Sequence, residues 1–373
     1  MRPKSGLPKR KAIRAVPIYD HGFIESTESR EAEKLREPTQ IRAVSFFSGC
    51  GGLDLGVRGG FTFLGTKYNP LPIKIIAAYD NDERSVDTYR LNLGDHIHQA
   101  DLTSVGMSDV PAADMLLGGF PCQDFSSSGP KTGLEGKRGR LFQVMVDYMF
   151  LHQPRIVVAE NVKHLARMSG GAVLAHIIER LEEPGYTFDV WTLNCPDFGL
   201  PQSRTRLFLV GIRNDDKRFP IKPTFKKGIK PVTIREAISD LERIHDETVP
   251  NQSQRFVATK ATGGAGQGDQ VSMADKVGYC VRANPKGRIQ FHYRLDRRLT
   301  VRECARLQSF PDSFVFPHSA TANIMQIGNA VPPIVGHRVA TSILDFVNGT
   351  SARPRHEFKN LGEQPSLFDA VGN

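Results

Sequence analysis

The sequence predicts an α/β protein whose strands end in glycine-rich or reactive turns. Two stretches carry this prediction. Ile41 to Phe47 is a short apolar run that feeds a glycine turn at residues 48–52, after which apolar residues recur at helical spacing. Met115 to Leu117 is a second apolar run, followed by Gly-Gly-Phe-Pro-Cys. Buried strands of this kind deliver their turns to the carboxyl edge of a sheet, where α/β proteins bind ligands.

The composition narrows the class of protein. A chain of 373 residues with 39% hydrophobic and 24% charged residues allows one large globular domain and a smaller one. Its five cysteines are odd in number and form no Cys-x-x-Cys pair, which predicts a reducing, cytoplasmic setting and no metal site. No apolar stretch is long enough for a membrane span. The net charge of +9 favours a polyanionic partner, or alternatively a surface that is charged for solubility.

Cys122 is the candidate nucleophile, because it ends the apolar run at the predicted sheet edge. A thiolate is intrinsically nucleophilic, so a fixed position and a nearby positive charge would activate it. The alternative is a small buried apolar residue, a common role for an intracellular cysteine. Residues 126–140 hold Ser, Gly, Pro, Lys and Arg with almost no apolar side chains, which predicts a loop that closes over an anionic substrate.

The first two strands indicate a nucleotide-like ligand. Glycines at 48–52 let the backbone approach a ligand and leave helix amides facing it. The second predicted strand, Ile73 to Tyr79, ends at Asp80. A carboxylate at that place commonly accepts both ribose hydroxyls of an adenosine ligand, although Asp80 or Asp82 could also cap the next helix. We expect Asp101 at the end of a third strand.

Further strands and helices follow in alternation. A predicted strand at 155–159 delivers Glu160 to the same edge as Cys122. Arg204 and Arg206 lie one residue apart on an extended segment and so point the same way, which suits a carboxylate, a phosphate or a carbonyl oxygen, or alternatively surface ion pairs. The remaining predictions are helices at 141–151, 173–181, 300–310 and 334–347, strands at 187–193 and 207–211, and a turn at 326–333.

The series of motifs FFSGCGGLDLG, YDND, DLT, GGFPCQDFS, AENVKHL, PQSRTRLFLVG, RRLTVRECARLQSFPDSF and QIGNAVPP, in this order, carries a resemblance. Over about residues 41–348 the chain resembles the DNA cytosine carbon-5 methyltransferases of bacterial restriction-modification type. This resemblance implies an S-adenosylmethionine-dependent, Rossmann-like α/β fold with a mostly parallel seven-stranded sheet. It also implies a monomer that acts on double-stranded DNA in the cytoplasm, at the nucleoid, beside a possible cognate restriction endonuclease.

The domain boundaries combine this resemblance with the change to a basic, Pro-rich composition after Gly211. We expect a basic and polar N-terminal extension at 1–40, a catalytic and cofactor-binding domain at 41–211, a target-recognition domain at 212–296, a C-terminal segment completing the catalytic domain at 297–349, and a tail at 350–373.

The resemblance also assigns site residues by position. The catalytic set is Cys122, Glu160, Arg204 and Arg206. The cofactor-binding set is Phe47, Gly49, Gly51 and Leu53 at the methionine end, Asp80 at the ribose, Asp101 and Leu141 at the adenine, and Asn329 at the amino-acid end. The DNA-binding set, drawn from the basic loop and the recognition region, is Ser128, Lys131, Arg138, Arg282, Asn284, Lys286 and Arg288. Cys50, Cys195, Cys280 and Cys304 are expected to be structural, with Cys50 open to alkylation.

Two other functions remain open from the sequence: an RNA (tRNA) cytosine-5 methyltransferase on the same fold, and a catalytically silent DNA-binding protein. The basic region at 212–296 favours duplex DNA over RNA, and the intact Cys122, Glu160 and Arg206 argue against a silent protein. Amino-group methyltransferases are disfavoured because the chain lacks their Asp/Asn-Pro-Pro-Tyr/Phe tetrapeptide.

Overall fold

The structure is a computed structural model that describes residues 40–121, 139–214, 230–256, 270–283 and 290–348, with only the backbone of Gly139 and Arg140. The chain divides into two units at Thr39/Gln40, and the described residues all lie in the second unit.

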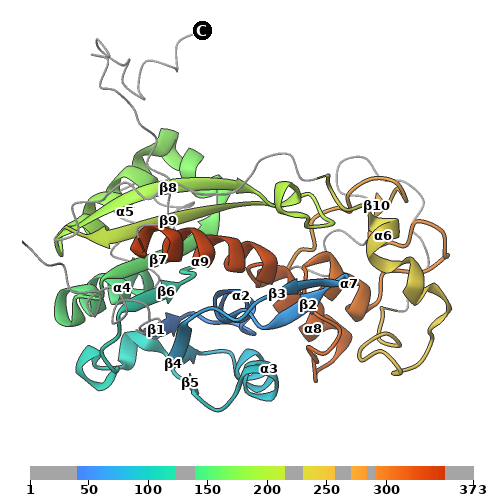
Figure 1. Cartoon of the computed structure of the whole chain (residues 1–373), viewed down its shortest axis with the longest axis horizontal. Helices are drawn as coiled ribbons and strands as arrows, with labels where there is room; N and C mark the ends of the chain where they lie inside the picture. Colours follow the sequence, from blue (N-terminus) through green and yellow to red (C-terminus); the bar gives the residue numbers. More distant parts are fainter. Residues whose placement is uncertain (1–39, 122–138, 215–229, 257–269, 284–289, 349–373) are drawn as a thin grey trace, which may run out of the picture. The chain divides into compact units, whose positions relative to one another are not determined.

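A seven-stranded sheet with the order β5-β4-β1-β6-β7-β9-β8 forms the centre of the described residues (Figure 1). The strands β5, β4, β1, β6 and β7 run parallel to one another, whereas β9 is antiparallel to both β7 and β8. The chain moves outward from β1 to β4 and β5, then returns to place β6 on the other side of β1. This reversal creates a switch point at the carboxyl ends of β1 and β6, the usual ligand site of an open α/β sheet. The bounds are β1 Ile41–Phe46, β4 Ile73–Asp80, β5 Ile97–Gln99, β6 Met115–Gly118, β7 Ile156–Val162, β8 Tyr186–Asn194 and β9 Thr205–Arg213.

Helices cover both faces of the sheet. Successive residues of β1 enter different cores: Ala43 packs with apolar residues of α2 and α9, and Val44 packs with those of α4 and α5. Strands buried on both faces need a continuous run of apolar residues, and β6 is buried along its whole length. Figure 1 shows α9 running beside α2, although the two lie near opposite ends of the chain; Gly56 of α2 permits this contact, because a Cβ there would lie 2.9 Å from the Cα of Gly336. The helices are α2 Gly52–Arg58, α3 Glu83–Leu93, α4 Gly139–His152, α5 Ala172–Glu182, α6 Ile234–Ile238, α7 Val301–Leu307, α8 Ala320–Asn329 and α9 Pro333–Val347.

Most predicted elements are confirmed, including the capping box at the start of α7, where Thr300 and Glu303 bond each other's backbone. Two predictions were wrong. The predicted turn at 326–333 is shorter, because its first four residues complete α8, which begins at the cap Ser319. Asp101 does not end a strand: β5 stops at Gln99, and Asp101 caps the short 3-10 helix Leu102–Ser104. The hairpin of β2 (Phe61–Phe63) and β3 (Thr66–Tyr68) was not predicted.

The region predicted as a target-recognition domain is less regular than the sheet. Its described part contains α6, a 3-10 helix at Ser239–Arg243, and the short parallel pair of β10 (Gln270–Val271) with β11 (Gln290–Phe291). Ile234 and Leu241 belong to the same apolar core as α7 and α8, so this part is packed onto the remainder of the unit. The boundaries at 212 and 296 stay predictions. None of the helices in the described ranges is long and apolar enough to cross a membrane.

Candidate active site

A cavity of about 520 Å³ opens at the carboxyl ends of β1, β4, β6 and β7, the edge that contains the switch point. Its volume lies in the range of small-molecule sites. The residues that line it and are used below are Phe47, Gly49, Leu53, Asp54, Asp80, Pro121, Glu160, Asn161, Gln326 and Asn329.

Glu160 and Arg206 form an ion pair at one end of the cavity. Val162 of β7 pairs with Arg206 of β9. The antiparallel strand β9 thus brings the arginine to the carboxyl end of β7, where Glu160 lies. Arg206 Nε lies 2.8 Å from Glu160 Oε1, and about a tenth of each side chain is exposed. Burial raises the pKa of Glu160, while Arg206 and Arg204 oppose the shift. The carboxyl therefore holds a proton more readily than an exposed glutamate does.

Arg204 makes different contacts from Arg206, although the sequence predicted a matched pair. It is 3% exposed and donates from Nη2 to the carbonyls of Gly328 (2.8 Å) and Ala330 (3.0 Å). Its Nη1 donates to the carbonyl of Val281 at 3.0 Å. These bonds tie the end of α8 to the start of β9. Arg204 therefore holds these two elements together, and it does not line the cavity.

Asn161 connects β7 to the loop that precedes Cys122. Its Nδ2 donates to the carbonyl of Phe120 at 3.0 Å, and its Oδ1 accepts from the amide of Val162 at 2.8 Å. Pro121 lines the cavity, and Cys122 is the next residue in the chain. Seven of the predicted residues lie outside the described residues: Cys122, Ser128, Lys131, Arg138, Asn284, Lys286 and Arg288.

The glycine turn and Asp80 meet at the other end of the cavity. The amide of Gly49 donates to Asp80 Oδ2 at 2.8 Å, and the amide of Asp82 donates to Asp80 Oδ1 at 3.0 Å. Asp82, not Asp80, caps α3, since it accepts from the amide of Ser85. Each Asp80 oxygen keeps a second lone pair for a ligand. Phe47 has a positive φ of 55°, which is uncommon for a bulky residue and turns the chain sharply after β1.

The chain is similar to proteins of known family. The model of the family described as C-5 cytosine-specific DNA methylase matches residues 41–345. The chain belongs to the C-5 cytosine-specific DNA methylase family. Two relatives of this methylase are the type II methyltransferases M.NgoFVII of Neisseria gonorrhoeae, 32% identical over 88% of this chain and 92% of the relative, and M.BsuRI of Bacillus subtilis, 32% identical over 88% and 85%.

Solved structures agree on the fold. A DNA modification methyltransferase encoded within a prophage of E. coli superposes with a TM-score of 0.63 at 20% identity, covering 83% of this chain and 99% of that chain. The Dnmt2 methyltransferase of S. pombe superposes with a TM-score of 0.59 at 18% identity, covering 82% and 98%. The α/β methyltransferase fold and the restriction-modification type of the methylase are thereby confirmed.

Three residues predicted to bind the cofactor lie outside the lining of this cavity, and their predicted roles stay predictions. Gly51 does not line the cavity; it has φ 89°, and a Cβ there would meet the Tyr89 ring at 2.8 Å, so this glycine serves packing against α3. Asp101 is exposed and accepts from the amide of Thr103, outside the cavity lining. Leu141 is half-buried on α4 and is also outside the lining. Phe47, Gly49, Leu53, Asp80 and Asn329 do line the cavity.

Asp54 was missed by the sequence reasoning because it lies inside the glycine-rich motif as a seemingly exposed helix residue. It is fully buried and lines the cavity. Its carboxylate accepts from Ser45 Oγ at 2.7 Å and from the Tyr89 hydroxyl at 2.8 Å. Burial raises the pKa of Asp54 to about 6, against the two hydrogen bonds.

The other cysteines of the methylase fit structural roles. Cys50, Cys195 and Cys304 are buried, and burial raises the pKa of Cys50 and of Cys195 to about 12. A thiol of this kind is poorly reactive, so the expected alkylation of Cys50 is disfavoured. Cys280 is half-buried, with its sulfur 3.4 Å from Arg204 Nη1. Within the described residues no cluster of His, Cys, Asp and Glu could hold a metal ion.

Proposed function

We propose that the protein transfers a methyl group from S-adenosylmethionine to carbon 5 of a cytosine within a specific duplex DNA sequence. The observation that carries this proposal is Glu160: a buried carboxyl with a raised pKa, held by Arg206 in a cavity that Pro121, the neighbour of Cys122 in the chain, also lines. An acid of this kind suits the ring nitrogen of a cytosine beside a thiol nucleophile.

The chemistry needs these groups because cytosine carbon 5 is a weak nucleophile. The Cys122 thiolate forms a bond to carbon 6, and Glu160 shares its proton with ring nitrogen 3, so that the electron pair moves toward carbon 5. When bound, S-adenosylmethionine supplies an electrophilic methyl group on its sulfonium. Loss of the carbon 5 proton, for which we propose an ordered water as the base, then expels the thiolate and restores the ring. Arg206 keeps Glu160 oriented throughout and faces the carbonyl side of the base.

The residues at the glycine turn fit the cofactor. Asp80 keeps acceptor capacity for two ribose hydroxyls beside its two backbone bonds. A Cβ built on Gly49 would meet nothing within 4 Å, so there is open space beside the Cα of this residue for a ligand to approach the backbone. Phe47, Leu53 and Asn329 would hold the remainder of the molecule. Asp101 and Leu141 would contact it only if the adenine extended beyond the cavity as it is lined here.

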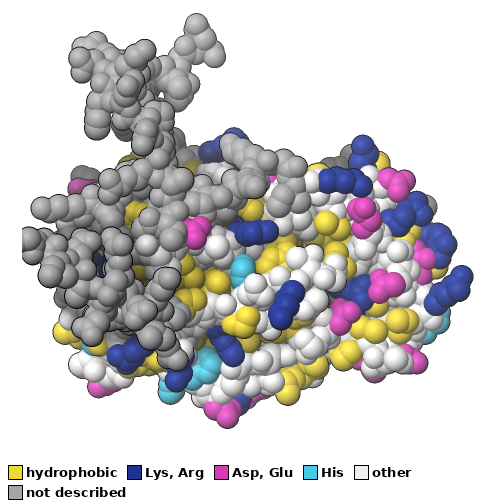
Figure 2. Space-filling model, viewed as in Figure 1, with side chains coloured by type: hydrophobic (Ala, Val, Ile, Leu, Met, Phe, Trp, Pro, Cys, Tyr) yellow, Lys and Arg dark blue, Asp and Glu magenta, His cyan; other side chains and the backbone are white. Residues whose placement is uncertain are grey.

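The target base must leave the helix, because carbon 6 is shielded in a duplex, at a cost of a few kcal/mol. The predicted DNA contacts lie mostly outside the described residues; of them, Arg282 is exposed. On the face seen in Figure 2, the visible Lys and Arg side chains are interspersed with Asp and Glu. We propose that the contacts to phosphate come from the basic loop at 126–140 and the recognition region at 212–296.

Protection of DNA from a cognate restriction endonuclease is the biological role that we propose, by analogy with relatives named type II methyltransferases. We propose that the protein acts as a monomer. Methyl transfer to duplex oligonucleotides and to tRNA, measured side by side, separates this function from the RNA alternative, because only one of the two polymers would be labelled.

Replacement of Cys122 by Ser tests the nucleophile. We expect Cys122→Ser to lose methyl transfer while it still binds duplex DNA. We also expect a 5-fluorocytosine duplex with the methyl donor to form a covalent adduct with the wild-type protein but not with Cys122→Ser. Cys280→Ser is the matched control and should still form the adduct, since Cys280 lies outside the cavity lining. Methylation by Cys122→Ser near the wild-type rate would refute the assignment.

A further inference from the structure

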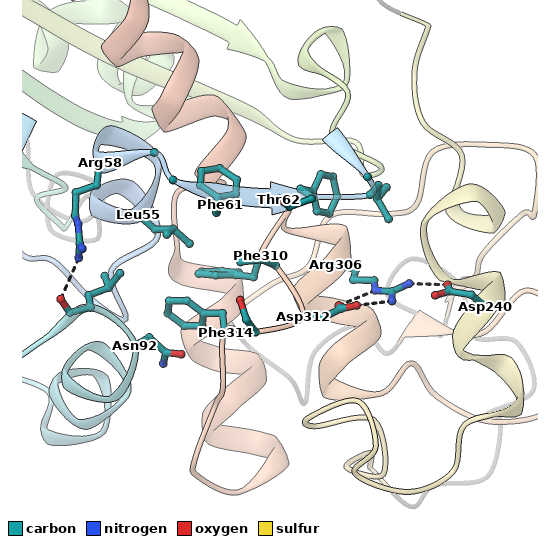
Figure 3. A pocket seen from close by; sticks show the side chains of 18 of the residues that line it. Leu55, Arg58, Phe61, Thr62, Asn92, Asp240, Arg306, Phe310, Asp312 and Phe314 are labelled. Atoms are coloured by element: carbon teal, nitrogen blue, oxygen red, sulfur yellow. Dashed lines mark hydrogen bonds and ion pairs between the residues drawn. The ribbon is translucent and has the colours of Figure 1, made fainter. Parts of the chain in front are cut away.

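Two of the cavities lined by described residues contain polar side chains, and these side chains differ in whether they already have partners. The cavity of about 920 Å³ in Figure 3 lies between the β2–β3 hairpin, α3 and the α6–α7 region. Its labelled charged side chains have partners: Arg306 bonds Asp240 and Asp312 at 2.6 Å each, and Arg58 donates to the carbonyl of Leu93 at 3.0 Å. These charged side chains are thus already engaged in contacts within the protein.

Gln326 in the active-site cavity is different. The residue is 3% exposed and lines that cavity, yet neither its Oε1 nor its Nε2 has a hydrogen-bond partner. A buried amide offers two donors and one acceptor, and leaving all of them unpaired costs free energy in the ligand-free protein. Such a cost is typical of binding sites, where a ligand removes it.

The neighbours of Gln326 place it at the glycine-turn end of the cavity. Its own carbonyl lies 3.9 Å from Cys50 Sγ, in the turn that follows β1. Asn329, one helical turn further along α8, lines the same cavity. Glu160 lies near the carboxyl end of β7, and β6 separates β7 from β1. Neighbouring strands are about 4.8 Å apart, so the two ends of the cavity are roughly 10 Å apart. Gln326 therefore lies away from the proposed base position.

We infer that Gln326 binds the amino-acid end of S-adenosylmethionine, an inference that rests on the proposed function. That end presents a carboxylate, which accepts, and an ammonium, which donates. One neutral amide can satisfy both, since Nε2 donates and Oε1 accepts. The ribose already has Asp80 at the tip of β4. The terminal torsion of glutamine is broad, so a rotation turns the amide from the wall into the cavity.

The test compares two ligands that differ in this end alone. S-adenosylhomocysteine carries the amino acid, whereas 5′-methylthioadenosine stops after the sulfur. Titration calorimetry on the full chain should show that Gln326→Met lowers the affinity for S-adenosylhomocysteine by about tenfold or more, because hydrogen bonds to charged groups are the strong ones. The affinity for 5′-methylthioadenosine should stay within about twofold of the wild-type value. Without ligand, Gln326→Met should be at least as stable to urea as the wild type, since two unpaired polar atoms are removed.

Gln252→Met is the matched control. Gln252 is 1% exposed, but its Nε2 donates to the carbonyl of Leu241 at 3.0 Å and its Oε1 accepts from Thr300 Oγ1 at 2.8 Å. This variant should lose stability and keep its affinity for S-adenosylhomocysteine. The inference is overturned if Gln326→Met binds S-adenosylhomocysteine as the wild type does, or if it loses both ligands equally. A wild-type protein that binds neither ligand would instead overturn the proposed function.

Discussion

Removal of the Glu160 proton tests the proposed chemistry most directly. Glu160→Gln keeps the shape of the side chain and an oxygen that can face Arg206, but an amide cannot give a proton to ring nitrogen 3. General acid catalysis contributes roughly 10²–10⁴-fold, so we expect methyl transfer under single-turnover conditions to slow by about that factor. Binding of S-adenosylhomocysteine should change little, because Asp80 and the glycine turn lie at the other end of the cavity.

The control for this variant is Glu242→Gln. Glu242 is also buried and paired, with contacts to Tyr293 and Arg294, but it is outside the lining of the active-site cavity. It should lower stability and leave the rate per folded molecule unchanged. The wild-type rate should also fall as pH rises, since burial raises the pKa of Glu160 and the acid form is lost above it. Equal losses of rate and of S-adenosylhomocysteine binding in Glu160→Gln would show a structural role and refute the reasoning.

Three further predictions concern stability and DNA binding. Gly328→Ala should destabilise the protein by about 1–3 kcal/mol in urea unfolding, because the new Cβ would lie 2.6 Å from the Arg282 carbonyl oxygen; Gly106→Ala, where a Cβ would meet the end of the Asp109 side chain, should cost less. Burial raises the pKa of Asp54 from 3.8 to about 6, so the native protein binds this proton more tightly than the unfolded chain does. The free energy of unfolding should therefore be higher below about pH 4. About 3 kcal/mol of it should be lost by about pH 6, at about 1.4 kcal/mol per pH unit. Urea midpoints at both pH values should show this loss in the wild type and a smaller one in Asp54→Asn. DNA affinity should fall steeply with salt, because phosphate contacts release counterions, and a flat response in a filter-binding series would contradict the proposed phosphate contacts.

Much of the fold could be predicted because the pattern of buried strands is local. The apolar runs at β1, β4, β6 and β7 were recognised as strands, and Glu160 lines the cavity at their carboxyl ends, although β7 extends to Val162, beyond its predicted end at residue 159. Gly51 could not be placed, because a glycine-rich turn does not reveal which residue faces the ligand and which faces the next helix. In this turn Gly49 faces open space, and Gly51 faces Tyr89.

Arg204 and Arg206 show the second limit of the sequence. Their spacing predicts that the two side chains point the same way. Arg206 reaches Glu160, however, whereas Arg204 donates to the carbonyls of residues 281, 328 and 330. Those acceptors are far from Arg204 in the chain, and no local pattern shows that α8 ends beside it. Asp101 is a similar case, since the end of β5 depends on its pairing with β4.

The reversed strand β9 explains how an acid with a raised pKa can be held in one orientation. Burial alone would protonate Glu160 but leave the carboxyl free to rotate, and an exposed arginine would orient it but lower its pKa. Because β9 runs antiparallel to β7, Arg206 at its start stands beside the end of β7, and Nε fixes one carboxyl oxygen at 2.8 Å. Arg204 then anchors the same strand start to α8, whose Gln326 and Asn329 line the cavity. The buried guanidinium of Arg204 thus connects the Glu160 end of the cavity with the proposed cofactor end. A substitution at Arg204 should therefore disturb both ends together.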